Sequence, residues 1–173
     1  TGGEDVEPLI QRVQVKAGDV FYMPAGMVHA IGGGILLYEI QQSSDVTYRL
    51  WDFNRVNDKG EKRPLHIRQS LDVIRPELKG QRAHMPEHPA QEITHLLDVP
   101  AFTLDCVAAD GACILPAAET FRVLTALEPL TLRWLEGEME LKAGDTVLLP
   151  AACPEVGLEG HGRALVSGVG RNA

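Results

Sequence analysis

One ten-residue stretch, Lys-Ala-Gly-Asp-Val-Phe-Tyr-Met-Pro-Ala at 16–25, recurs without a gap as Lys-Ala-Gly-Asp-Thr-Val-Leu-Leu-Pro-Ala at 142–151. In both copies a Gly-Asp pair precedes a four-residue apolar run, and a proline ends that run. Glycine tolerates the positive φ of a tight turn, and an aspartate carboxylate can accept hydrogen bonds from nearby backbone amides. Proline has no N–H and stands where a strand no longer pairs. The repeat therefore predicts two β units built on one strand-turn-strand plan.

Short runs typical of β-strands dominate the rest of the chain. Two segments, 4–12 and 64–74, are the helix candidates, and Pro76 ends the second of them. Many short strands with few helices indicate an all-β barrel or sandwich. The strand-turn-strand unit is similar to that of cupin barrels, a double-stranded β-helix of the jelly-roll type. The predicted strands are 13–15, 20–23, 35–41, 46–51, 102–107, 121–127, 130–135, 138–141, 146–149 and 164–169.

Composition narrows the classes of function. The 173 residues suffice for one compact domain or two small ones. A net charge of -8 argues against a nucleic-acid partner, and no apolar run is long enough to predict a membrane span. The three cysteines, Cys106, Cys113 and Cys153, are odd in number and widely spaced, which fits neither a disulfide framework nor a zinc knuckle. We therefore expect reduced, mostly buried cysteines in a cytoplasmic protein.

His29 is the candidate metal ligand. It follows the strand-ending proline of the first copy, in Pro-Ala-Gly-Met-Val-His at 24–29, where an imidazole can point into the mouth of a barrel. Imidazole is a good ligand for zinc and related divalent ions. The second copy has Glu155 at the equivalent position, so the first copy is the one that matters chemically. A lone histidine in a strand-rich region is nevertheless more often a structural hydrogen-bonding residue. We interpret His66 in that way, as an anchor for the segment that follows it.

Residues 16–74 resemble the type I mannose-6-phosphate isomerases. The resemblance is carried by 16–32, by 38–55 (Tyr-Glu-Ile-Gln-Gln-Ser-Ser-Asp-Val-Thr-Tyr-Arg-Leu-Trp-Asp-Phe-Asn-Arg) and by 63–67. The remainder, to residue 173, is similar to the degenerate C-terminal cupin-like domain of the shorter bacterial enzymes. The resemblance implies an all-β, cupin-type fold with an incomplete first barrel and a second, smaller cupin-like domain. It divides the chain into the C-terminal half of the catalytic cupin domain at 1–75, a linker at 76–92 and the second domain at 93–173.

The resemblance also implies roles for individual residues. His29 matches the histidine that completes the zinc site of the family, and Arg49 matches its active-site arginine, which contacts the sugar phosphate. Glu39 and Asp45 match acidic positions of the same pocket, and Glu39 is the candidate for acid/base catalysis. From pattern alone, Arg49 could be an outward strand residue, Glu39 a satisfied carboxylate and Asp45 part of a turn.

The implied reaction interconverts mannose 6-phosphate and fructose 6-phosphate by moving a proton between adjacent carbons. A Lewis-acidic metal polarises the carbonyl, and a positioned carboxylate or imidazole carries the proton. A guanidinium suits a phosphate or an enediolate, because its fork of donors matches oxyanion geometry. The residue types at 29, 39 and 49 are those that this chemistry requires.

The chain departs from the family pattern in one respect. The metal site of the family also draws on a Gln-Val-His-Pro-like and a Lys-Thr-Glu-like motif, and neither occurs in this sequence. A catalytic zinc normally has three protein ligands. Three hypotheses follow: a fragment of a zinc-dependent isomerase that is inactive alone, a non-catalytic sugar-binding or regulatory cupin, or a structural half that assembles with a separate N-terminal half. Open barrel edges would also favour self-association.

Overall fold

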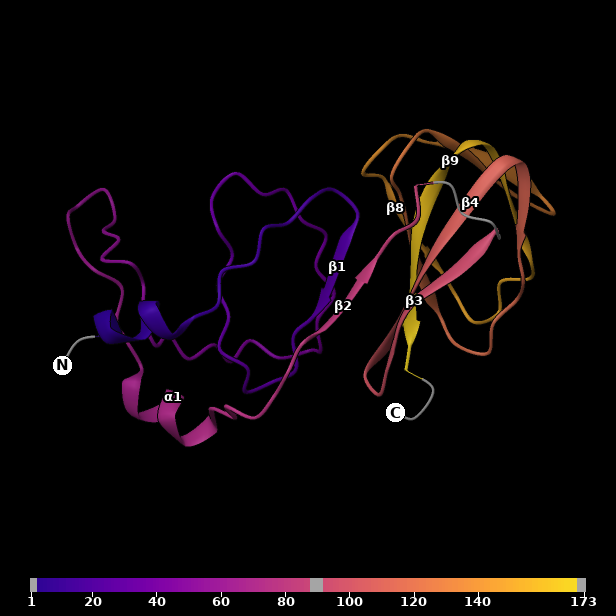
Figure 1. The fold of residues 1–173 in the computed structure, drawn as a ribbon. Coiled ribbons are helices and arrows are strands. Elements are labelled where there is room, and N and C mark those ends of the chain that lie inside the picture. The colour runs from indigo at the N-terminus through magenta and orange to yellow at the C-terminus, as the bar shows by residue number, and fades with distance from the viewer. Residues whose placement is uncertain (1–2, 88–91, 171–173) are drawn as a thin grey trace. The chain divides into compact units, whose positions relative to one another are not determined.

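The computed structural model describes residues 3–87 and 92–170 and divides into two compact units (Figure 1). Unit 1 comprises 1–17 and 21–82, and unit 2 comprises 18–20 and 83–173. Among the described residues, no helix has the length and apolar character needed to cross a membrane. In chain order the elements are the 3-10 helix η1 (Gly3–Leu9), β1 (Asp19–Tyr22), α1 (Ile67–Val73), β2 (Gln81–His84), β3 (Ile93–Val99), β4 (Phe102–Leu115), β5 (Arg122–Ala126), β6 (Leu130–Trp134), β7 (Gly137–Leu141), β8 (Thr146–Leu149) and β9 (Val156–Val169).

Unit 2 is built on one seven-stranded antiparallel sheet. Its order is β3-β4-β9-β5-β8, with β6 paired to β9 and β7 paired to β6. The two longest strands, β4 and β9, pair along their whole length, from Phe102 opposite Val169 to Leu115 opposite Val156. The other edge of β9 is shared, because residues 157–159 pair with β6 and residues 164–168 pair with β5. The sheet therefore divides into two parts that curl around a common interior (Figure 1).

Two opposed glycines let the long strands change direction. Gly111 of β4 lies opposite Gly160 of β9 in the register, and their φ angles are 97° and 128°. L-residues with a side chain rarely adopt such angles, whereas glycine does so at little cost. The sequence had suggested only shorter strands here, 102–107 before Gly111 and 164–169 after Gly160. The structure instead continues both strands through them.

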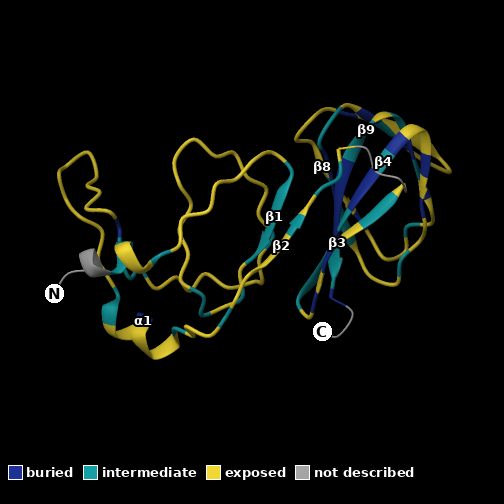
Figure 2. Ribbon diagram, viewed as in Figure 1, coloured by how far each residue is buried: buried dark blue, intermediate teal, exposed yellow. Residues whose placement is uncertain are grey.

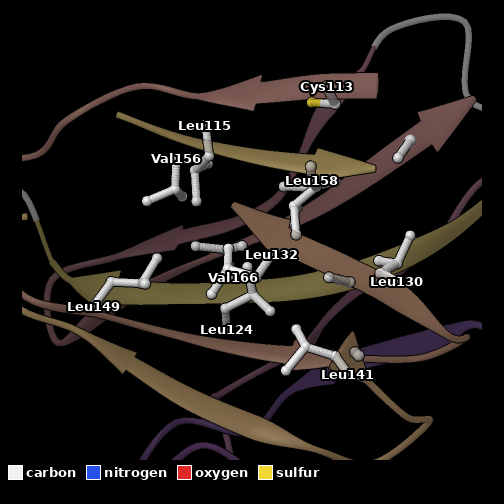
Figure 3. Packing of buried hydrophobic residues seen from close by; sticks show 14 residues of the cluster. Cys113, Leu115, Leu124, Leu130, Leu132, Leu141, Leu149, Val156, Leu158 and Val166 are labelled. Carbon is white, nitrogen blue, oxygen red and sulfur yellow. The ribbon is translucent and has the colours of Figure 1, made fainter. Parts of the chain in front are cut away.

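The interior of unit 2 is apolar and closely packed (Figure 3). Leu124 and Leu158 have no exposed side-chain surface, and burying one such side chain contributes about 1.5–3 kcal/mol. Cys106 and Cys113 are buried and Cys153 is partly buried, and all three are free, as the sequence predicts. The strands supply this interior by alternation, since successive side chains point to opposite faces of a sheet. The labelled core residues of Figure 3 are Cys113, Leu115, Leu124, Leu130, Leu132, Leu141, Leu149, Val156, Leu158 and Val166.

The sequence repeat is also a structural repeat. Gly18 and Gly144 have φ angles of 87° and 91°, so each copy begins with the predicted glycine turn. In the second copy the Asp145 carboxylate accepts a hydrogen bond from the backbone N–H of Lys142 at 2.8 Å. This is the contact from aspartate to backbone that the Gly-Asp pair predicts.

The turns after the two prolines match as well. The N–H of Met27 donates to the carbonyl of Pro24 at 3.1 Å, and the N–H of Cys153 donates to the carbonyl of Pro150 at 2.9 Å. The strands that these prolines follow are β1 and β8, and β8 has the predicted bounds of 146–149. The common plan of the two copies therefore extends from the glycine turn to the turn beyond the strand.

Unit 1 has much less regular structure than the sequence predicts. Strands were expected at 13–15, 35–41 and 46–51, and the structure has none there. The helix expected at 64–74 is shortened to α1, and the expected linker contains β2. A strand forms only where its backbone N–H and C=O groups find a neighbouring strand. Between residues 3 and 84 of the described chain, strand pairing is limited to the β1–β2 pair and an isolated bridge between Val56 and Lys62.

Most residues of unit 1 are correspondingly exposed to solvent, as the colouring of Figure 2 shows. From residue 6 to residue 82, the described residues that are buried are Asp52 and Ser70. Apolar side chains that a closed barrel would bury are exposed, and Leu36 is 101% exposed. Others are Ile31, Ile35, Leu37, Tyr38, Val46 and Tyr48. The first barrel is therefore incomplete, as the family resemblance implies.

Candidate active site

All four predicted site residues lie in unit 1. His29 follows the turn after β1. Glu39 lies in the irregular segment that the sequence had assigned to the strand 35–41, and Asp45 lies between the predicted strands 35–41 and 46–51. These three are exposed, whereas Arg49 is half-buried. Within the described part of the chain, no hydrogen bond or ion pair joins any two of the four. Their common location in unit 1 is consistent with one site, and their roles stay predictions.

The imidazole of His29 has a defined orientation. Its Nδ1 lies 3.0 Å from the carbonyl oxygen of Met27. A carbonyl oxygen can only accept, so Nδ1 carries the proton and Nε2 keeps its lone pair. Histidines that bind metals are usually held in this way, with the nitrogen that does not bind the metal donating to a carbonyl or carboxylate. The geometry of His29 therefore fits one ligand of a metal ion.

The described residues do not form a complete metal site. Among residues 3–87 and 92–170, no three His, Cys, Asp or Glu side chains come together in a way that could hold an ion. A catalytic zinc normally takes three protein ligands and leaves one position open. The residues present thus fit a single ligand, His29, and the other donors would have to come from elsewhere.

Arg49 is tied to the segment that leads into α1. Its backbone N–H donates to Nδ1 of His66 at 3.1 Å, and its backbone carbonyl accepts from the N–H of His66 at 2.8 Å. Its guanidinium Nη1 donates to the carbonyl of Pro64 at 3.3 Å. Neither Glu39 nor Asp45 contacts this guanidinium in the described structure. The positive charge of Arg49 is therefore held in place by neutral groups and is not cancelled by a carboxylate.

An ion-pair cluster around Asp52 supports the same region. The Asp52 carboxylate is 7% exposed and accepts from Nε of Arg63 at 2.7 Å and from Nη2 of Arg55 at 2.8 Å. The hydrogen bond from Arg63 lowers the pKa of Asp52 to about 2, and Arg55 adds to this effect against the opposing effect of burial. Phe53 and Asn54, next along the chain, have φ angles of 51° and 54°. The cluster closes the loop that separates Arg49 from Pro64.

Sequence analysis did not identify this cluster or the contact between His66 and Arg49. The alternating charges of residues 52–63 are the signal that could have indicated a closed loop. His66 does precede α1, whose Ser70 N–H donates to the His66 carbonyl at 2.8 Å. The ring of His66, however, binds Arg49, which no local spacing predicts.

Comparisons with known proteins agree with the fold and with the motif. No family model matches the chain. It is 36% identical over 165 residues to mannose-6-phosphate isomerase ManA of Bacillus subtilis, which covers 93% of this chain and 52% of that protein. Over 70 residues it is 57% identical to the mannose-6-phosphate isomerase of Streptococcus mutans, covering 40% of this chain and 22% of that protein.

Two solved structures share the fold. The mannose 6-phosphate isomerase from Bacillus subtilis matches with a TM-score of 0.64 at 24% identity, over 74% of this chain and 42% of that one. A variant of phosphomannose isomerase from Salmonella typhimurium matches with a TM-score of 0.51 at 17% identity, over 64% and 29%.

These similarities identify the fold class of the chain. The sheets are antiparallel and the fold is all-β, of the cupin jelly-roll type, as predicted. The chain is similar to the cupin-type C-terminal part of the type I mannose-6-phosphate isomerases. It spans about half the length of the curated relatives that it matches, 52% for ManA and 53% for the probable isomerase GmuF.

Proposed function

We propose that the chain is part of a metal-dependent aldose–ketose isomerase that interconverts mannose 6-phosphate and fructose 6-phosphate. The observation that carries the proposal is the Arg49 guanidinium, whose partner is the neutral Pro64 carbonyl. A guanidinium that is not paired with a carboxylate keeps its fork of donors available for an anion. A sugar phosphate supplies such an anion, and the relatives of this chain are named for a sugar phosphate substrate.

His29 is proposed as a zinc ligand of the same site. Its Nδ1 is engaged with the Met27 carbonyl, so Nε2 is the atom that would meet the ion. A bound zinc ion would supply Lewis acidity towards a substrate oxygen. In this proposal the chain provides one ligand, and the remaining ligands come from the half of the relatives that it does not match.

Glu39 is proposed as the acid/base residue, with Asp45 lining the substrate pocket. Both side chains are exposed in unit 1, and in the described structure neither is neutralised by an arginine or lysine. A carboxylate that is not held in an ion pair remains available to accept a proton from carbon. Arg49 would then stabilise the negative charge that develops on the substrate oxygen.

A second hypothesis concerns the chain by itself. The exposed apolar side chains of unit 1 and the sparse strand pairing among its described residues favour a half that assembles with a separate N-terminal half or with another copy. Alone, the chain would then be inactive or would serve as a sugar-binding or regulatory cupin. The reduced cysteines support a cytoplasmic setting, and the net charge of -8 argues against nucleic acid as a partner.

The test measures zinc and isomerase activity together. This chain alone and a full-length isomerase that contains it are assayed with mannose 6-phosphate, and their zinc content is determined. We expect substoichiometric zinc and no turnover for the chain alone, and one zinc with turnover for the longer protein. His29→Ala in the longer protein should remove zinc, whereas His161→Ala, an exposed histidine of unit 2, should not. Full zinc occupancy of the His29→Ala variant would exclude the ligand role.

A further inference from the structure

Arg49 is held at three points by the segment that begins at Pro64. The Nδ1 atom of His66 accepts from the Arg49 N–H at 3.1 Å, and the His66 N–H donates to the Arg49 carbonyl at 2.8 Å. The Pro64 carbonyl accepts from the guanidinium at 3.3 Å. Together these bonds fix both peptide groups of Arg49 and the far end of its side chain.

The ring of His66 is not used for the helix that it precedes. His66 is the N-cap residue of α1, where side chains that accept a hydrogen bond from the first helical turn are favoured. It makes no such side-chain bond, and it serves the helix through its carbonyl, which accepts from the Ser70 N–H at 2.8 Å. The imidazole is directed to Arg49 instead. A purely structural cap would not need this ring.

The contact also fixes the tautomer of His66. Because Nδ1 accepts from a backbone N–H, it carries no proton, and the proton of a neutral ring lies on Nε2. The Tyr48 ring lies beside the imidazole, with centroids 6.2 Å apart and the planes tilted by 57°. The ring is thus oriented by a hydrogen bond and by an aromatic neighbour.

We propose that His66 is a positioning residue for Arg49. By holding the peptide groups of Arg49 in place, together with the Pro64 carbonyl at the guanidinium, it sets the direction in which the positive charge meets an anionic sugar. This inference rests on the proposed function, since Arg49 needs a set direction only if it contacts substrate. A side chain that is oriented in advance loses less freedom when substrate binds and stays aligned in the transition state.

The hydrogen bond itself is tested on this chain by NMR. We expect the Nε2–H tautomer for His66 and a scalar coupling between its Nδ1 and the Arg49 amide nitrogen. His66→Asn places an acceptor near the position of Nδ1, whereas His66→Gln places one near Nε2, so the two variants are a matched pair. Amide exchange at Arg49 should rise about tenfold or more in His66→Gln and stay within about threefold in His66→Asn. A ring protonated at Nδ1, or equal exchange in all three proteins, overturns the proposal.

The functional consequence is tested in a full-length isomerase that contains this chain. With mannose 6-phosphate, His66→Gln should lower kcat/KM about tenfold and His66→Asn should recover most of that loss, with zinc content unchanged in both. If both variants match the wild type while Arg49→Ala is inactive, the positioning role is wrong and the proposed function stands. If Arg49→Ala itself turns over normally, the proposed function fails and the positioning role fails with it.

Discussion

The buried carboxylate of Asp52 is bound by the guanidinium of Arg63, which lies eleven residues further along the chain. Nε donates at 2.7 Å to one oxygen, and Nη2 contacts the other, so the pair is bidentate. Paired geometry of this kind is both stronger and more directional than a single bond. Arg63 is covalently joined to Pro64, whose carbonyl holds the Arg49 guanidinium. The closure of the loop by Asp52 therefore helps to place the arginine on which the proposed function depends.

Acid should open this loop. The pKa of Asp52 is lowered from 3.8 to about 2, mainly by the hydrogen bond from Arg63. Because the folded pKa is the lower one, the stabilisation is fully present above about pH 4 and is lost as the pH falls towards 2. A titration of the Asp52 carboxyl carbon and of the Arg55 amide by NMR should follow one transition near pH 2. Asp52→Asn should abolish this transition, and a midpoint near pH 4 in the wild type would contradict the bidentate pair.

The stability of unit 2 should depend on its interior leucines. Leu158 is 0% exposed, and its truncation to alanine should reduce the free energy of unfolding by about 2–5 kcal/mol. Leu148 is 63% exposed and provides the control, because its truncation should cost about 0.5 kcal/mol or less. Urea unfolding of the two variants gives both values. Equal losses would mean that the interior of the sheet is not the core.

A pair of glycines in unit 2 offers a sharper test of packing. A Cβ added at Gly162 would lie 2.9 Å from Cβ of Glu128, whereas one added at Gly157 would lie 3.8 Å from Cβ of Arg133. Glu128 binds Arg163 at 2.6 Å, so a displaced Glu128 would also weaken that ion pair. We expect Gly162→Ala to cost about 1–3 kcal/mol and Gly157→Ala to be much milder. Thermal unfolding of both variants measures the difference, and a similar Tm for the two would contradict the packing described.

The three thiols should react at different rates. Burial raises the pKa of Cys113 to about 11, with Glu92 adding to the shift, and burial also raises the pKa of Cys106. Cys153 is only partly buried. Because the thiolate is the reactive form, Cys153 should react first with a disulfide reagent at pH 8, and the other two should react after unfolding. Cys153→Ser should remove the fast phase; a fast phase that persists would assign it to a buried thiol.

The sequence predicted the strands of unit 2 better than those of unit 1 for a physical reason. The run at 146–149 lies between a Gly-Asp turn and a proline, and its partner β5 lies in the same sheet. The run at 35–41 was also predicted as a strand but pairs with nothing in the described structure. Propensity describes a residue, whereas a strand requires a partner, which may be far away in sequence.

The same distinction applies to the site. His29 and Arg49 could be selected from sequence because their motif and their chemistry are local. The bond from Arg49 to His66 spans 17 residues, and the pair between Asp52 and Arg63 spans 11. Contacts at such separations depend on how the loop folds back, which no periodic pattern encodes. Gly111 and Gly160 lie within continuous strands, whereas the predicted strands 102–107 and 164–169 ended short of them.

The proposed function is tested most directly at Arg49. In a full-length isomerase that contains this chain, Arg49→Ala should preserve folding and zinc content, because the guanidinium bonds only to the Pro64 carbonyl in the described structure. It should lower kcat/KM for mannose 6-phosphate by at least about two orders of magnitude. This loss corresponds to roughly 2.7 kcal/mol of transition-state stabilisation, which is reasonable for removing a charged contact to a developing anion.

The lysine variant separates charge from geometry at the same position. Arg49→Lys keeps the charge but replaces a planar fork by a single ammonium group, which cannot reach two oxyanion positions at once. We therefore expect it to recover little of the lost kcat/KM. Arg12→Ala is the matched control, since Arg12 is 83% exposed and pairs only with Glu7 among the described residues. Steady-state kinetics with mannose 6-phosphate compare all three. Near-normal turnover by Arg49→Ala would show that Arg49 has no catalytic role, because removal of a group that binds the anionic substrate should slow the reaction.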